Sequence, residues 1–215
     1  MKMLELPDPV SRVLKRIVEG EILLVEFNSF SNVELLPFEF CSIGKTVFIE
    51  IGDKLHVKLY ALMKALNDSD LLDRLRRTPI ISVSNFYVSV PGFNIINIPF
   101  NEITKIISKF YSLMRDKSEN NLLILSGIEQ IALHFDIYGF MREFAGLKVA
   151  LPSVTFILFV NYDAVERRTL AVLESLSTSV VRLEGRVDFD SGRVRKYVYL
   201  VKSIDPASDA IAEIG

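Results

Sequence analysis

The sequence is poor in the residues that hold metals and disulfides. It has one cysteine, Cys41, two histidines, His56 and His134, and no tryptophan. A single thiol forms no internal disulfide, and no ligand spacing typical of a zinc site is present. We therefore expect no metal, no cofactor and a reducing cytoplasmic location. Cys41 lies in an apolar setting between Phe38 and Phe40, which favours a buried, unreactive thiol.

An excess of positive charge is also absent. The 25 Lys and Arg residues are offset by 27 Asp and Glu residues, so the formal net charge is −2. Such a chain has no long-range positive field to attract a phosphate backbone, and we predict no nucleic-acid binding. The densest basic cluster, Arg74, Arg76 and Arg77, ends a predicted helix, where cations suit the helix dipole.

Long apolar runs are missing as well. The longest, residues 149–160, contains Pro152, Ser153 and Thr155 and is far shorter than the ~20 residues of a membrane span. The acidic start, Met1 to Pro9, does not look like a signal peptide. We expect no membrane association. Hydrophobic residues nevertheless make up 50% of the chain, so a large core and a surplus of apolar surface are expected, which favours a homo-oligomer.

The hydrophobic pattern alternates between helical and strand-like segments. Helices are predicted over residues 8–20, 33–41, 54–66, 70–77, 101–117, 135–145 and 164–175. Strands are predicted over residues 22–27, 46–51, 80–84, 93–98, 122–125 and 154–160, and a hairpin pairs 179–187 with 194–203 around Asp190-Ser191-Gly192. This order predicts one α/β domain over residues 1–215, a three-layer sandwich with a mainly parallel sheet and a C-terminal antiparallel hairpin. Its core spans about 10–203, and the tail 204–215 is expected to be loosely held.

Gly44-Lys45-Thr46 is a tempting match to a phosphate-binding loop, but its context is wrong. The first glycine of the G-x-x-x-x-G-K-[ST] motif would fall on Glu39, a carboxylate that repels phosphate. A strand, 46–51, follows the match directly, so no helix N-terminus would point its N–H groups at an anion. We interpret this segment as a turn from a helix into a strand.

The loop in the position of a phosphate loop is Phe27 to Asn32, after the first buried strand. It contains neither glycine nor lysine. The backbone therefore cannot easily wrap a phosphate, and no side chain neutralises one.

Several segments resemble those of RecA, RadA and KaiC-type ATPases. Residues 20–26 resemble the lead-in to their phosphate loop, 121–126 their Walker B strand, and 155–161 the strand that follows it. Residues 180–184 and 195–202 resemble the closing strands of KaiC-type domains. More narrowly, the chain resembles a small Pyrococcus-type family from hyperthermophilic archaea, degenerate RecA/KaiC-like proteins that lack a P-loop and have no assigned activity. The resemblance implies a RecA-like fold.

The departures from these ATPases concern the residues that handle nucleotide and magnesium. Ser126 occupies the position of the Walker B aspartate and cannot hold magnesium as a carboxylate would. Asp53 lies near the position of the catalytic acid, and Asn161 near that of the sensing polar residue. Each is either a relic of that role or an ordinary helix or loop cap. His56, close to Asp53, would face the same crevice.

Three functions remain open at this point. The first is a non-catalytic RecA/KaiC-like module that works through protein contacts, with itself or with a peptide at a sheet edge or groove; Phe86 to Phe93 could form such an edge or could be core. The second is an enzyme or small-molecule binder that uses the crevice at the strand ends. The third, an active ATPase, fits least well. The candidate crevice residues are Asn28, Ser29, Ser31, Asp53, His56, Ser126 and Asn161.

Overall fold

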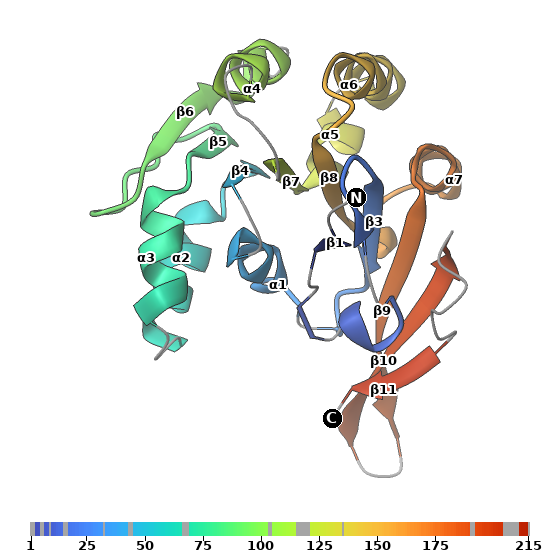
Figure 1. Ribbon diagram of the computed structural model, residues 1–215. Helices are drawn as coiled ribbons and strands as arrows, with labels where there is room; N and C mark the ends of the chain where they lie inside the picture. Colours follow the sequence, from blue (N-terminus) through green and yellow to red (C-terminus); the bar gives the residue numbers. More distant parts are fainter. Residues whose placement is uncertain are drawn as a thin grey trace.

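The computed structural model describes residues 3–4, 7–8, 10–14, 17–31, 33–42, 45–65, 69–102, 105–114, 121–134, 136–189, 192–203 and 211–214. A nine-stranded sheet forms its centre, with the order β11-β10-β9-β3-β8-β7-β4-β5-β6 (Figure 1). The strands are β3 (Ile22–Phe27), β4 (Lys45–Ile51), β5 (Ile80–Ser84), β6 (Ile95–Pro99), β7 (Asn121–Ser126), β8 (Thr155–Asn161), β9 (Ser179–Asp188), β10 (Arg193–Lys202) and β11 (Ile211–Ile214). Strands β3 to β9 run parallel, and β10 and β11 add antiparallel pairings.

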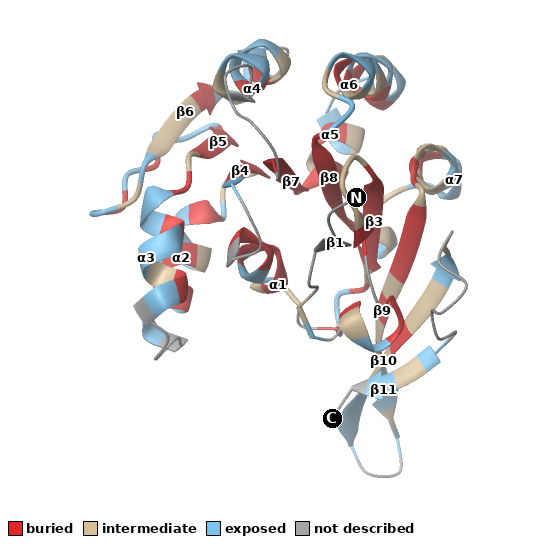
Figure 2. Ribbon diagram, in the orientation of Figure 1, coloured by how far each residue is buried: buried red, intermediate tan, exposed pale blue. Residues whose placement is uncertain are grey.

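The central strands are apolar on both faces because both faces are covered. Leu23 and Val25 of β3 belong to one core cluster, and Ile22 and Leu24 belong to the other. Successive side chains of a strand point to opposite faces, so a continuous apolar run fills both layers. Figure 2 shows the resulting band of buried residues through the middle of the sheet.

Helices cover the two faces in separate groups. On one face lie α1 (Leu36–Glu39), α2 (Leu55–Ala65) and α3 (Ser69–Arg77), together with η2 (Phe40–Ser42). On the other lie α4 (Lys105–Met114), α5 (Ile128–His134), α6 (Ile137–Ala150) and α7 (Arg167–Leu176), with η3 (Phe100–Glu102) and η4 (Tyr162–Ala164) among the connections. The predicted three-layer α/β sandwich with a C-terminal antiparallel hairpin is confirmed.

The predicted first helix is wrong. Residues 8–20 contain one 3-10 turn, η1 (Val10–Arg12), and a short strand, β2 (Ile17–Val18), which pairs with β1 (Met3–Leu4). The apolar spacing arose because Val10, Val13, Leu14 and Ile17 are all buried, without forming one helical face. β-branched Ile17 and Val18 are better suited to a strand.

The tail prediction also needs correction. Residues 204–210 lie outside the described residues, but β11 pairs with β10 from Tyr199↔Ile211 to Lys196↔Ile214. Part of the tail therefore extends the sheet, because β10 would otherwise be a bare edge.

Two predicted helices have different bounds in the structure, and one helix was not predicted. The predicted helix 33–41 is reduced to the four residues of α1 followed by η2, and the predicted helix 135–145 extends over 137–150. The short helix α5 was not predicted. Its turn needs Gly127 at φ +85°, where an added Cβ would lie 2.0 Å from the Ile51 carbonyl oxygen. Among the described residues, no helix has the length and apolar character needed to cross a membrane.

Candidate functional site

Parallel strands of this fold end together at one edge of the sheet, where ligands of α/β proteins bind. The loop after β3 begins with Asn28, which is buried and bonds reciprocally to the backbone of Gly185 on β9. Its side-chain nitrogen donates to the Gly185 carbonyl at 2.9 Å, and its side-chain oxygen accepts from the Gly185 N–H at 2.8 Å. Gly185 is required there, because a Cβ would lie 2.3 Å from the Phe30 carbonyl oxygen. The loop is therefore fastened directly against β9.

Three backbone N–H groups of the same loop, those of Asn28, Ser29 and Ser31, bond to the protein itself. Asn28 N–H donates to the Leu183 carbonyl and Ser31 N–H to the Asn28 carbonyl, at 3.3 Å and 3.1 Å. Ser29 N–H donates to the Asp163 carboxylate at 3.2 Å. A phosphate cradle needs such groups to be free and to converge on an anion. In this protein these N–H groups are bonded to the protein and hold the loop in place.

The helix after the loop offers no anion site either. α1 has four residues, and its second residue, Pro37, has no N–H. Leu36 N–H donates to the Val33 carbonyl, and Phe38 N–H donates to the Leu35 carbonyl. Its first N–H groups are thus already bonded.

The end of β8 joins this network. Asn161 accepts from the Asp163 N–H at 3.1 Å and donates through its side-chain nitrogen to the Ser29 hydroxyl at 3.3 Å. Asn161 caps η4, which agrees with its interpretation as a loop cap. Of the candidate residues, Asn28, Ser29, Ser31 and Asn161 are brought together, and they bond to one another or to the neighbouring backbone.

The other candidates lie apart from this network. Asp53 accepts from the backbone and side chain of Asn85, at 2.9 Å and 3.4 Å, and so fixes the loop after β5. His56 is exposed on α2, and among the described residues no hydrogen bond joins its side chain to Asp53. Ser126 is buried at the end of β7, where its Cα is the partner of Glu50 on β4.

Sequence reasoning missed a buried carboxylate next to Ser126. Glu50 is 2% exposed and forms an ion pair with Lys58 of α2, while its Oε2 atom has no hydrogen-bond partner among the described residues. Glu129 of α5 lies nearby and accepts weakly from the Asn161 N–H at 3.4 Å. Burial raises the pKa of Glu129, and the charge of Glu50 adds to this, while Lys58 opposes it. Acidic side chains therefore gather at these strand ends.

A second missed carboxylate lies on the opposite face of the sheet. Glu26 of β3 is fully buried, and its Oε2 accepts from Arg182 at 2.6–2.7 Å. Arg182 also approaches Glu174 at 3.3 Å and the ring of Tyr162 at 5.3 Å. Burial raises the pKa of Glu26 to about 7 against the attraction of Arg182. Glu26 and Glu50 each interrupt an apolar strand run, and that interruption was the available signal.

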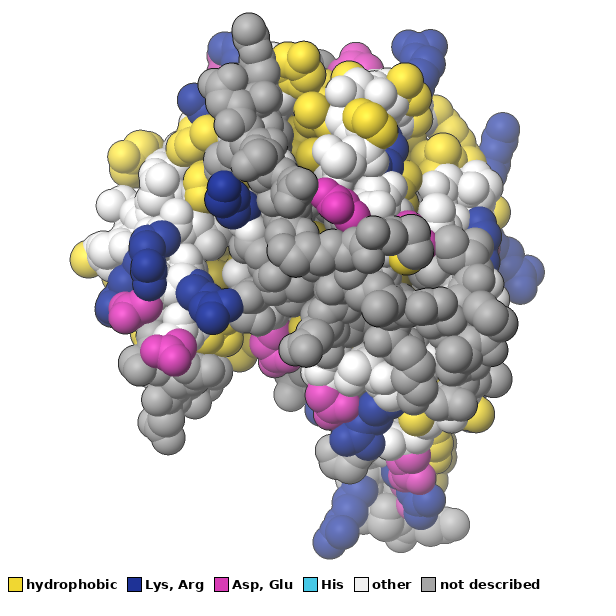
Figure 3. Space-filling model, in the orientation of Figure 1, with side chains coloured by type: hydrophobic (Ala, Val, Ile, Leu, Met, Phe, Trp, Pro, Cys, Tyr) yellow, Lys and Arg dark blue, Asp and Glu magenta, His cyan; other side chains and the backbone are white. Residues whose placement is uncertain are grey.

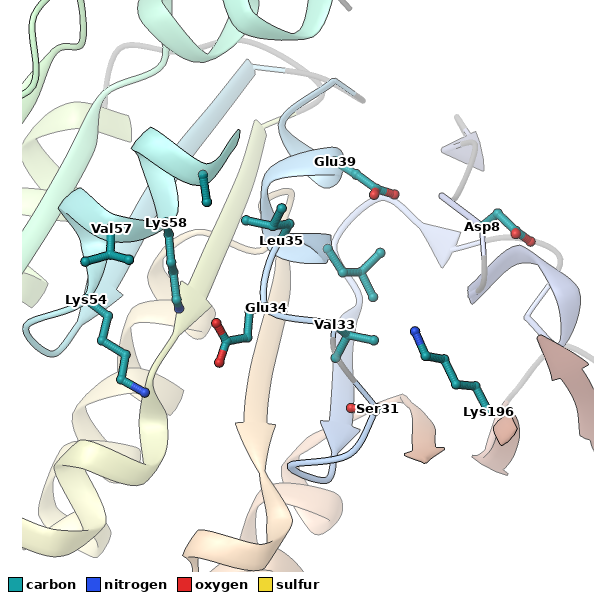
Figure 4. Close-up of a pocket in the computed structure, with 12 residues that line it drawn as sticks. Asp8, Ser31, Val33, Glu34, Leu35, Glu39, Lys54, Val57, Lys58 and Lys196 are labelled. Carbon is teal, nitrogen blue, oxygen red and sulfur yellow. The ribbon is translucent and has the colours of Figure 1, made fainter. Parts of the chain in front are cut away.

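A groove of about 420 Å³ lies beside this edge, between the loop before α1 and helix α2 (Figure 4). Its apolar lining includes Val33, Leu35 and Val57, and charged side chains of both signs surround it. Of the predicted crevice residues, only Ser31 lines it. Among the described residues, no group of three or more His, Cys, Asp or Glu side chains is placed to hold a metal ion.

Comparison with known proteins identifies the fold. No family model matches the sequence, and no curated protein matches it significantly. Among solved structures, the KaiC-like protein PH0186 of the archaeon Pyrococcus horikoshii is similar, with a TM-score of 0.64 and 15% identity over 98% of this chain and 97% of that one. A second Pyrococcus horikoshii protein, PH0250, has a TM-score of 0.57 and 20% identity over 90% of this chain and 92% of that one. At these identities the likeness shows the fold alone: the chain folds like the KaiC-like protein PH0186.

Proposed function

We propose that this protein is a non-catalytic KaiC-like domain that binds no nucleotide and acts through protein contacts. The observation that carries the proposal is the state of the loop after β3. Its N–H groups at positions 28, 29 and 31 donate to Leu183, Asp163 and Asn28. Binding a phosphate there would require these bonds to break while supplying no lysine in exchange.

The charges at the strand ends act in the same direction. Asp163 lies against the loop itself, and the buried Glu50 and the partly buried Glu129 lie behind it. The half-buried Lys58 beside Glu50 is already paired with it. A triphosphate would therefore meet carboxylates where an ATPase supplies cations, and each unscreened contact of like charges is unfavourable.

Uncovered edges and apolar side chains support a role in protein contacts. Strand β6 ends the sheet, and a groove of about 400 Å³ runs between it and α4. The segment before β6 is divided: Val88 and Val90 are buried in the core, whereas Phe86 and Tyr87 are 69% and 83% exposed. An open edge beside exposed aromatic side chains suits a peptide or a second protein chain.

The alternative, a small-molecule binder, has less support. The polar crevice residues bond to each other and to the backbone, and the groove beside them shares only Ser31 with that set. The groove's apolar lining and mixed charges suit a protein surface equally well.

Thermal unfolding with added Mg·ATP tests the proposal. A ligand that binds only the folded state must raise the midpoint, so a protein without a nucleotide site should unfold at the same temperature in millimolar ATP as in sodium sulfate of equal ionic strength. A magnesium-dependent rise of several degrees that sulfate does not reproduce would contradict the proposal, as would release of phosphate above the buffer rate.

A further inference from the structure

One surface of the β9–β10 hairpin is apolar and uncovered. Leu183 and Val198 are register partners and pack in the core. Two residues further along each strand the partners are Gly185 and Lys196, and two further still they are Val187 and Val194. Side chains two apart lie on one face of a strand, so the core face continues outward along the hairpin.

This face ends at the hairpin tip, where apolar exposure is greatest. Val187 and Val194 are 37% and 45% exposed, and Phe189 is 94% exposed. Figures 1 and 3 show the hairpin standing out from the body as an arm. We call Val187, Val194 and Phe189 the apolar strip, and exposed apolar side chains gathered in this way mark a contact surface more often than chance placement.

The opposite face of the arm is internally bonded and stiffens it. Arg186 forms two bonds with Glu184, at 2.9 Å and 3.1 Å, and Arg195 pairs with Asp188 at 3.0 Å. The Arg186 guanidinium also lies 5.5 Å from the Tyr197 ring centre. The arm therefore presents its apolar strip on a preformed ribbon, which lowers the entropic cost of docking.

The surface beside the arm matches this strip. Lys196, at the base of the arm, also lines the 420 Å³ groove, so the strip and the groove are continuous. The groove is bordered by apolar Val33, Leu35, Val57 and Ala61, and its volume exceeds that of one aromatic side chain (Figure 4).

The charges at the groove suit a second copy of the same chain. Glu34, Lys54 and Lys196 line it, and their side chains make no hydrogen bond or ion pair with the residues that the structure describes. A two-fold interface brings each patch against its own copy, so a patch with unpaired charges of both signs can pair with itself.

We propose that two copies form a closed dimer in which the arm of each copy, residues 186–189 and 192–195, places Phe189 in the groove of the other. The groove and the arm adjoin on one face, so a single two-fold axis satisfies both contacts and closes the dimer. This proposal deepens the proposed function, on which it rests, by naming the partner and the contact surface.

Sedimentation equilibrium tests it with three variants. Phe189→Ser removes the inserted ring, and Val57→Glu places a charge in the groove; both positions are exposed, so the fold should survive, as circular dichroism can check. Each lost ring should weaken association about ten-fold, and therefore the two-ring dimer about a hundred-fold. Val149→Ser, at an 82% exposed apolar position on α6 in the helix layer on the other face of the sheet, is the matched control and should leave the dimer unchanged.

A mixing experiment tests the exchange of arms. Phe189→Cys on one copy and Ala61→Cys on a mass-tagged second copy should form a disulfide between unlike chains, because the proposed contact brings residue 189 to the groove that Ala61 lines. Native Cys41 is buried and should not compete. A wild-type monomer at about 100 µM, or a dimer that Phe189→Ser leaves intact, would overturn the dimer proposal and leave the proposed absence of nucleotide binding standing. Stabilisation by Mg·ATP would overturn that absence whatever the assembly state.

Discussion

The stability of this protein should fall as pH rises through the titration of Glu26, and Glu26→Gln should remove that dependence. Glu26 is fully buried under α7, with Arg182 bonded to one carboxylate oxygen and the other oxygen unpartnered among the described residues. Burial raises its pKa from an ordinary 4.5 to about 7. The folded state therefore holds a proton on Glu26 at pH values where the unfolded chain has released it.

The sign and size follow from linkage. A group that binds its proton more tightly when folded stabilises the folded state fully below its unfolded pKa, and this stabilisation is lost as pH rises to the folded pKa. Each pKa unit corresponds to about 1.4 kcal/mol, so the interval between 4.5 and about 7 amounts to a loss of about 3 kcal/mol. Gln has the same shape and no proton to lose, so the stability of the variant lacks this pH-dependent contribution.

Urea unfolding of both proteins between pH 4 and pH 9 gives the measurement. The free energy of unfolding of the wild type should fall relative to that of Glu26→Gln, by about 3 kcal/mol over the titration. Glu174→Gln is the matched control: it removes a negative charge that raises the Glu26 pKa, so the fall should shrink without vanishing. A constant difference across this range, or a wild type that gains stability relative to the variant as pH rises, would show that Glu26 does not hold its proton more tightly in the folded state.

Three further predictions concern the strand ends and the core. Gly185→Ala should lower the free energy of unfolding in urea by about 1–3 kcal/mol, because its Cβ would press on the Phe30 carbonyl; an unchanged midpoint would contradict the loop packing. Lys58→Met should cost about 3–5 kcal/mol by leaving Glu50 buried and unpaired, and adding Glu50→Gln should recover most of the loss. Cys41 should stay unmodified by Ellman's reagent in the native state and react in urea, because burial raises its pKa.

The buried strands were the part of the fold most accessible from the sequence. Apolar runs bounded by polar residues located β3, β4, β5, β7 and β8 to within two residues at each end. Hydrophobic spacing failed at residues 10–18, where buried positions at helical intervals belong to a 3-10 turn and a strand. Periodicity reports which side chains are buried, and several backbone paths can bury the same set.

The site was less accessible because its contacts are remote in sequence. Asn28 and Gly185 are 157 residues apart, and neither residue type reveals that each satisfies the other. The absence of glycine and lysine from the loop could be seen in the sequence, since it depends on composition alone. The sequence could also have identified Glu26 and Glu50 as buried, paired carboxylates, because a charge inside an apolar strand is costly to bury and needs a partner.

We propose that the loop after β3 leaves no site for a nucleotide, because its N–H groups at positions 28, 29 and 31 are bonded to the protein. Equilibrium dialysis of the protein against labelled ATP with magnesium measures this directly. We expect an equal ATP concentration on both sides of the membrane at protein concentrations of about 100 µM, which corresponds to a Kd weaker than about 1 mM. Retention of close to one ATP per chain, lost when magnesium is removed, would contradict it.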